Sequence, residues 1–273
     1  MSVSKIKTIV ISALVLINVF FLAVIVIDTV ADVHSERQAI ENACAVLNNG
    51  GISIDPDNVK IHGALRALRT VRGDDAESVI ARAILGPTDI TDQGVIYRYE
   101  NAERGAAEFY SAGDFEITLN DGAVTNAEGA VKTVQKLLRG MKIEISEITV
   151  SGASGSETVT ATGAFRGVSI FNCTIEFVFK GESLETIKGR SVTGIAATDD
   201  GAVISSAGTA LLGFLAWSCR NDVGCGHIYS VESGYQYRVS GSFGEGVIAP
   251  AWLIVSDKGR YIIDDASGEV WPY

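Results

Sequence analysis

One feature constrains this chain more than any other, an uncharged and mainly apolar run of twenty residues from Thr8 to Ile27. At 1.5 Å of rise per residue, a helix of this length spans about 30 Å, the thickness of the hydrocarbon core of a bilayer. Lys5 and Lys7 precede the run and Asp28 follows it, so the positive-inside rule places residues 1–7 in the cytoplasm. The sequence therefore predicts a single transmembrane helix over residues 8–27, with everything after it exported.

A cleaved secretory signal peptide is the competing interpretation of the same segment. Thr29-Val30-Ala31 loosely resembles a small-residue cleavage site. The apolar stretch, however, exceeds the roughly 7 to 15 residues that are typical of a signal peptide. An uncleaved anchor is the favoured prediction.

The charge of the predicted exported part argues against nucleic acid as a partner. All 33 acidic residues lie at or beyond Asp28, whereas two of the 22 basic residues precede it. Binding to a polyanion requires clustered Lys and Arg side chains, and here they are scattered among a larger number of carboxylates. The acidic balance indicates mainly a soluble surface.

The four cysteines are optional for folding, because about 240 residues can bury a substantial core without covalent links. Cys219 and Cys225 bracket a short glycine-containing loop, and export would permit a disulfide between them. Cys44 and Cys173 lie in apolar contexts that are typical of buried free thiols. No Cys or His spacing indicates zinc.

Residues 28–124 are predicted to form a first unit of helices followed by an antiparallel meander. Apolar residues at helical spacing predict a helix that Asn48-Asn49-Gly50-Gly51 ends: Ile40, Ala43, Cys44 and Leu47. Asp74, three residues before Glu77, resembles a capping box and predicts a second helix, which Gly86-Pro87 ends. Alternating residues then predict strands over 95–100, 107–110 and 115–119.

Residues 125–273 repeat this order and are predicted to form a second unit. Thr125, three residues before Glu128, predicts the start of a helix with one apolar face: Val131, Val134, Leu138 and Met141. A third helix, about 206–217, is too short to cross a membrane. Strands are expected over 143–150, 159–165, 168–180, 184–192, 252–255, 260–264 and 269–271. The pattern favours an α+β fold with curved antiparallel sheets over a doubly wound parallel sheet.

No catalytic constellation can be assembled from the sequence. His34, His62 and His227 lack metal-ligand spacing and neighbouring nucleophile motifs. Asp199-Asp200-Gly201 and Asp264-Asp265 lack the alternating carboxylates of a calcium loop and are better explained as turns. We therefore expect no enzyme activity, no metal and no cofactor; a site built from carboxylates distant in sequence is the remaining enzymatic hypothesis, and no spacing points to it.

The predicted membrane helix contains one amide, Asn18, near the bilayer centre. Apolar residues flank it at helical spacing and suggest a face for contact with another transmembrane helix: Ile11, Leu14, Phe21, Leu22 and Ile25. An interhelical hydrogen bond to such an amide contributes roughly 0.6 to 2 kcal/mol, which favours association without choosing a partner. The alternative is that a lone Asn is simply tolerated in lipid.

Two parts of the sequence resemble a known family. The opening, Ser4 to Ile9 and Leu16 to Leu22, resembles the start of the YycH/YycI regulatory proteins of Gram-positive bacteria, and YycI most closely. Gly51-Ile52 after the first helix agrees with that family. The closing residues, Ala249 to Val255 followed by Arg260 to Asp264 and Gly268, resemble its final hairpin and also a PepSY-type hairpin.

The resemblance implies an accessory protein, bound to the cell membrane by one helix, that regulates an essential two-component sensor histidine kinase. Its partners would be that kinase, with or without a second membrane-anchored regulator, contacted through the anchor and the extracytoplasmic domain. The family carries no catalytic residues to transfer. The alternative is a PepSY-like extracytoplasmic module that binds a ligand or inhibits a protease.

Overall fold

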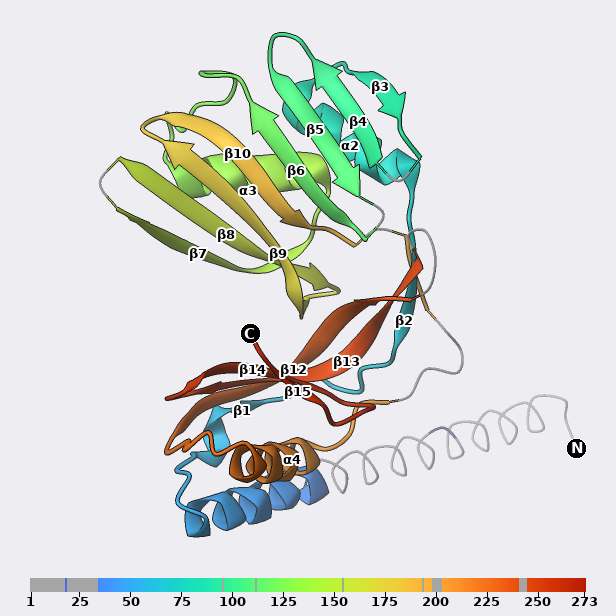
Figure 1. The fold of residues 1–273 in the computed structure, drawn as a ribbon. Helices are drawn as coiled ribbons and strands as arrows, with labels where there is room; N and C mark the ends of the chain where they lie inside the picture. The colour runs from blue at the N-terminus through green and yellow to red at the C-terminus, as the bar shows by residue number, and fades with distance from the viewer. Residues whose placement is uncertain are drawn as a thin grey trace, which may run out of the picture.

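The structure, a computed structural model, describes Asn18 and residues 34–94, 96–110, 112–153, 155–192, 194–197, 203–240 and 245–273. They form two lobes, one above the other in Figure 1. The upper lobe is residues 74–190, and the lower lobe is residues 34–71 together with residues 195–273. The chain therefore leaves the lower lobe, builds the upper lobe and returns.

The upper lobe contains an antiparallel sheet and two helices. Its helices are α2 (Asp74–Leu85) and α3 (Ala130–Met141). Its strands are β3 (Asp89–Asp92), β4 (Ile96–Asn101), β5 (Gly105–Tyr110), β6 (Asp114–Leu119), β7 (Ile145–Ala153), β8 (Ser156–Phe165), β9 (Val168–Lys180) and β10 (Ser183–Arg190). They are ordered β7-β8-β9-β10-β6-β5-β4-β3 across the sheet, and both helices cover one face of it (Figure 1).

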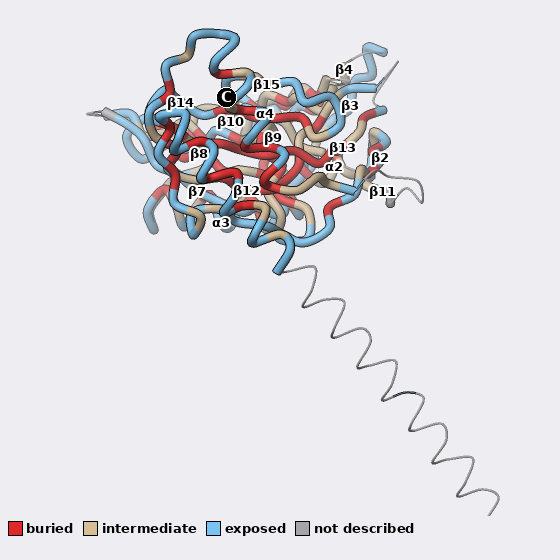
Figure 2. Tube along the Cα trace, turned by 90° about the horizontal axis from the view of Figure 1, so that it is seen from below, coloured by how far each residue is buried: buried red, intermediate tan, exposed pale blue. Residues whose placement is uncertain are grey.

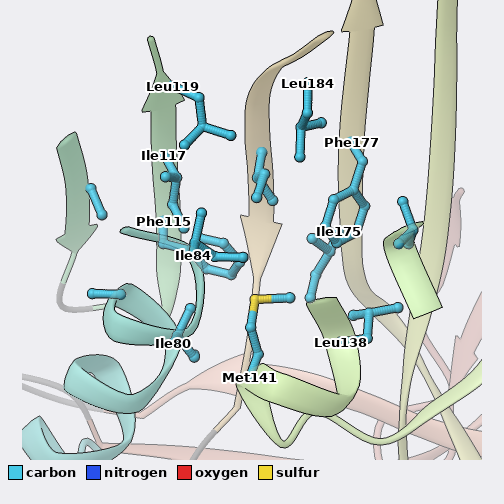
Figure 3. Packing of buried hydrophobic residues seen from close by; sticks show 14 of the residues in the cluster. Ile80, Ile84, Phe115, Ile117, Leu119, Leu138, Met141, Ile175, Phe177 and Leu184 are labelled. Atoms are coloured by element: carbon cyan, nitrogen blue, oxygen red, sulfur yellow. The ribbon is translucent and has the colours of Figure 1, made fainter. Parts of the chain in front are cut away.

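Side-chain periodicity explains why these residues form these elements. Helix α3 buries Ala130, Val134, Leu138 and Met141, which share one face. Strand β6 alternates buried Phe115, Ile117 and Leu119 with polar residues. Figure 3 shows helix residues such as Leu138 and Met141 packed with strand residues such as Ile175 and Phe177 in a single core.

Both capping boxes predicted for these helices are wrong. Helix α2 begins after Gly73, and α3 begins after Gly129, five residues later than Thr125; neither N-cap makes a side-chain hydrogen bond. Glu77 instead binds Arg72, at 2.6 Å. Thr125 forms a β-bridge with Ser183, so a long-range strand contact displaces the local cap.

The lower lobe combines two distant stretches of chain. From the first come a helix over residues 34–49, a 3₁₀ turn (Pro56–Asn58), β1 (Val59–Lys60) and β2 (Leu68–Val71). From the second come β11 (Ile195–Ala197), α4 (Ala207–Arg220), β12 (Ile228–Val239), β13 (Glu245–Ser256), β14 (Gly259–Asp264) and β15 (Val270–Pro272). The strands β12, β13 and β14 form an antiparallel meander, and β13 also pairs with β2.

Two helices cover the lower sheet side by side, the 34–49 helix and α4 (Figure 1). They approach closely at Gly208, where an added Cβ would lie 3.0 Å from the carbonyl oxygen of Ala39. The carboxylate of Glu36 accepts the N–H of Ala207 at 2.9 Å, at the start of α4. The predicted face of the first helix is confirmed, because Ile40, Ala43, Cys44 and Leu47 are all buried.

A short parallel contact joins the lobes into one 15-stranded sheet. Ile170 of β9 lies opposite Tyr235 of β12. Two residues further on, the Asn172 side-chain amide donates to the carbonyl of Tyr237 at 2.7 Å and accepts its N–H at 2.8 Å. The Asn172 side chain thus makes the pair of hydrogen bonds that a backbone residue would make between β9 and β12. Figure 2, seen from below, shows buried residues through the middle of the molecule and exposed residues around its outside.

The α+β class with mainly antiparallel, curved sheets is confirmed. The boundary predicted between residues 124 and 125 falls inside the upper lobe, where β6 pairs with β10. The two lobes therefore do not coincide with the two predicted units. None of the described helices is long and apolar enough to cross a membrane; of the predicted anchor, residues 8–27, only Asn18 is described, as helical and exposed.

Candidate functional site

A cleft of about 480 Å³ lies in the upper lobe beside the return connection, and Ile195 of the lower lobe also lines it. Its wall comes from α2, the end of α3, the β8–β9 hairpin and the chain that leaves β10. Most of the lining side chains are apolar: Val79, Ile80, Met141, Ile143, Ala164, Phe165, Ile170, Val192 and Ile195. Its volume and mainly apolar lining are typical of a site that binds a small ligand.

The charged residues of the cleft sit on its rim. Glu144 accepts the N–H groups of Arg166 at 2.9 Å and Gly167 at 2.6 Å, so its carboxylate holds the β8–β9 turn. Both turn residues have positive φ. Lys142 ends α3 in the left-handed region, with φ 58°, and makes no ion pair within the described part of the chain. Its ammonium group is therefore the rim cation available to a ligand.

The first connection between the lobes, residues 72–73, is fixed to the upper lobe by a buried ion pair. Arg72 donates to both carboxylate oxygens of Glu77, at 2.6 and 3.1 Å, and to the carbonyl of Phe109 at 3.2 Å. Its guanidinium also lies 4.5 Å from the centre of the Tyr97 ring. Because both ionic side chains are largely buried, this bidentate contact sets where the chain enters α2.

The return connection, residues 191–194, begins at a second arginine–carboxylate pair. Arg190 donates to both oxygens of Asp114, at 2.8 and 2.9 Å, and this hydrogen bonding raises the pKa of Arg190. The guanidinium lies 5.8 Å from the centre of the Tyr237 ring in the lower lobe. Burial raises the pKa of the Tyr237 hydroxyl. At each of the two connections between the lobes, an arginine therefore makes a bidentate contact with a carboxylate.

The cleft has four side chains with ionisable or hydroxyl groups among its described lining residues, Asp75, Lys142, Glu144 and Ser191. Its described lining contains no His or Cys, and its one hydroxyl side chain belongs to Ser191. Within the part of the chain that the structure describes, no group of three or more His, Cys, Asp and Glu residues could hold a metal ion.

The sequence did not predict this cleft. Its walls come from residues near positions 75, 142, 165 and 192, which only the fold brings together. Each apolar residue in it has the periodicity of an ordinary core position, so no local signal distinguishes it.

The residues predicted for helix–helix contact are not tested by the structure. Ile11, Leu14, Phe21, Leu22 and Ile25 lie outside the described residues. Asn18 is helical and exposed. That contact face stays a prediction.

The disulfide suggested for Cys219 and Cys225 is not formed in this structure. Cys219 is an exposed free thiol on α4, whereas Cys225 is a buried free thiol in the lower core. The Cys225 thiol donates to the carbonyl of His227 at 3.7 Å, and burial raises its pKa. Cys44 and Cys173 are buried free thiols, as the sequence predicts.

Asp264, Asp265 and His62 make hydrogen bonds within the fold. Asp264 accepts the N–H and hydroxyl of Ser267, and Asp265 accepts the N–H and hydroxyl of Ser205. His62 lies against β12, where its Nδ1 is 2.9 Å from the carbonyl oxygen of Ser233. The turn interpretation of Asp264-Asp265 agrees with these bonds; Asp199-Asp200-Gly201 lies outside the described residues.

Comparison with known proteins shows relatives by fold alone. No family model and no curated protein matches the sequence. An uncharacterized protein from Eubacterium rectale has a similar structure, with a TM-score of 0.52 and 10% identity over 81% of this chain and 92% of that one. The Bacillus megaterium YpeB C-terminal domain aligns with a TM-score of 0.36 and 10% identity, over 74% and 98% of the two chains.

Proposed function

We propose that this chain is a membrane-anchored, extracytoplasmic accessory protein that regulates a two-component sensor histidine kinase by binding, with the cleft beside the return connection as the binding site of its ectodomain. The anchor and its orientation rest on the Thr8 to Ile27 run and on Lys5 and Lys7 before it. The kinase rests on the resemblance of Ser4 to Leu22 to the YycI family.

The position of the cleft is the observation that carries the binding role. An occupant would touch α2, α3 and the return connection at Val192 together. Val192 lies in the connection that returns to the lower lobe, and Ile195 of the lower lobe also lines the cleft. Regulation by binding requires two states that a partner binds with different affinity, and a ligand at this junction would favour one lobe arrangement over others.

Co-purification from membranes tests the anchor part of the proposal. The full-length chain should retain a sensor histidine kinase, and replacement of residues 8–27 by an unrelated transmembrane helix should release it. Asn18→Leu should weaken the association by roughly 0.6 to 2 kcal/mol, about 3- to 30-fold. Leu16→Ile, two residues away and off the predicted face, is the matched control. Normal kinase signalling in cells that lack the chain contradicts the proposal.

A filled cleft tests the ectodomain part separately. Val79→Trp places a large side chain in the cleft and should reduce kinase retention. Val46→Trp, at an exposed position on the 34–49 helix, should leave retention unchanged. If Val79→Trp retains the kinase while the anchor replacement loses it, the cleft is not the kinase site and the anchor contact stands.

The second candidate function is a PepSY-like binding or protease-inhibiting module. Its support is the closing hairpin, in which Trp252 of β13 lies opposite Ile263 of β14. The purified chain would then inhibit a secreted protease of the same cells without a kinase present. If the purified chain inhibits none of the secreted proteases of these cells, the protease-inhibiting function is excluded.

A further inference from the structure

Five described strands have only one neighbouring strand: β1, β3, β7, β11 and β15. An open strand edge presents unpaired N–H and C=O groups, and proteins usually shorten such edges or place charges and proline on them. Four of the five follow this rule. Strands β1, β3, β11 and β15 contain two to four residues, and β15 includes Pro272.

Strand β7 departs from the rule. It runs for nine residues, Ile145–Ala153, and pairs only with β8. It contains no Lys, Arg or Pro, and Glu147 is its one charged residue. Its side chains from Ile145 to Gly152 are all exposed or half-buried, and Val150 is 50% exposed. After an irregularity between Ile145 and Glu147, its register with β8 runs unbroken, so the free edge is regular enough to pair.

We propose that the free edge of β7 pairs antiparallel with β7 of a second copy of this chain, around a two-fold axis at Thr149. The charge pattern of the strand favours this occupant. With Thr149 on the axis, Glu147 lies opposite Ser151 and no like charges face each other.

The apolar residues of β7 also match in this register. Ile148 would lie opposite Val150, and directly opposed residues in an antiparallel pair point to the same side of the sheet. Ile148 packs against the core of the upper lobe. The partner's Ile148 would therefore cover the exposed Val150 and extend that core across the axis.

The edge at the other end of the upper sheet shows what a protected edge looks like. Strand β3 is only four residues long, and two of them, Asp89 and Asp92, are acidic, so self-pairing would bring the carboxylates of two copies to the same short edge. The same sheet thus has one end that opposes self-pairing and one end that favours it. This inference rests on the described residues and does not depend on the proposed function.

Cysteine cross-linking of the purified full-length chain tests the pairing. The background carries Cys219→Ser, because Cys219 is exposed while the other three cysteines are buried. Thr149→Cys should give a covalent dimer under mild oxidation, with a yield about tenfold above that of Thr91→Cys, the matched threonine on the exposed β3 edge.

Two further variants test the register. A mixture of Glu147→Cys and Ser151→Cys copies should cross-link, whereas Glu147→Cys alone should not, because its two copies would be four residues apart along the strand, about 13 Å. Thr149→Lys should abolish the cross-link between Glu147→Cys and Ser151→Cys when it is present in both copies, since two like charges then meet at the axis.

Three results overturn the proposal. The first is a Thr149→Cys yield no higher than that of Thr91→Cys. The second is a cross-link of Glu147→Cys with itself that equals the mixed pair. The third is an adduct of Thr149→Cys with a different protein in native membranes, which would assign the edge to that protein. Protection of Cys173 from alkylation shows in each variant that the fold is intact.

Discussion

The two lobes bury similar helix-and-sheet layers but obtain them from the chain in different ways. The upper lobe uses one continuous stretch, residues 74–190, whereas the lower lobe brings together residues 34–71 and 195–273. Contacts between distant residues carry a larger loop-closure cost before they stabilise anything. The comparison teaches that the upper lobe can form from neighbours in sequence, while the lower lobe depends on the upper lobe to bring its two parts together.

The placement of tryptophan makes this difference measurable. All three tryptophans, Trp217, Trp252 and Trp271, belong to the lower lobe. Tryptophan fluorescence therefore reports the lower lobe alone, whereas circular dichroism reports both. Substitutions can be placed in either lobe and followed with the two signals.

The largest expected effect comes from the upper core. Phe177 of β9 is fully buried, and Phe177→Ala should lower the free energy of unfolding by about 3 to 5 kcal/mol because it leaves a cavity. Thermal unfolding followed by circular dichroism should shift strongly. The fluorescence transition should shift with it, because the lower lobe loses the element that joins its two stretches.

Phe214→Ala in α4 is the counterpart in the lower core, where Phe214 is also fully buried. It should lower the fluorescence transition by a comparable amount and leave a separate upper-lobe transition in the circular dichroism signal. If both variants give identical, coincident transitions, the two lobes unfold as one unit and the comparison fails.

The next effect concerns the first connection between the lobes. Arg72→Met should cost about 3 kcal/mol of unfolding free energy, because Glu77 is left buried without its cation. The double variant Arg72→Met with Glu77→Met should recover most of that loss in chemical denaturation. A double variant as unstable as the single one would show that the ion pair itself, and not the stranded carboxylate, is responsible.

A smaller effect is expected at the contact between β9 and β12. Asn172→Ala removes two hydrogen bonds to Tyr237 and should cost about 2 kcal/mol. The circular dichroism and fluorescence transitions should then separate, because fewer hydrogen bonds connect the two lobes. Asn42→Ala, at an exposed position on the 34–49 helix, should change stability by less than about 0.5 kcal/mol.

Helix α4 offers a local test within the lower lobe. The hydroxyl of Ser206 accepts the N–H of Thr209 at 3.2 Å and caps the helix. Ser206→Ala should cost about 1 kcal/mol, read from the fluorescence transition, whereas Ser206→Asp should retain the cap. Equal destabilisation by both substitutions would rule out the capping role.

The last effect, which appears only above pH 9, is the pH dependence from Cys173. Burial raises its pKa to about 12, from 9.0 for an ordinary thiol. The folded chain thus holds this proton more tightly than the unfolded chain, and the resulting stability is present below pH 9 and is lost as the pH rises toward 12. Unfolding of Cys173→Ala and of the parent chain should be compared across this pH window. If the free energy of unfolding changes with pH in the same way in both, Cys173 does not cause the pH dependence. At pH 8 the native thiol should resist alkylation while Cys219 reacts.

The sequence by itself determined the inward-facing residues and the existence of several helices and strands, but it did not predict β2, β3, β11 or β12. The buried face of α3 includes Val134, Leu138 and Met141 as the helical period indicates, and strand β9 has the predicted bounds of 168–180. These features depend on local periodicity, because a helix or strand exposes one face at a fixed repeat whatever its neighbours are. The long uncharged run at the N-terminus is likewise a local property, and its role stays a prediction.

Only the tertiary structure decided which elements meet. The parallel contact of β9 with β12, the pairing of Glu77 with Arg72 in place of a helix cap, and the cleft beside Val192 all join residues distant in sequence. Many alternative pairings satisfy the same inward-facing pattern, and the choice among them depends on the packing of the whole core. That choice also left β7 at an open edge, whereas β9 pairs with β8, β10 and β12.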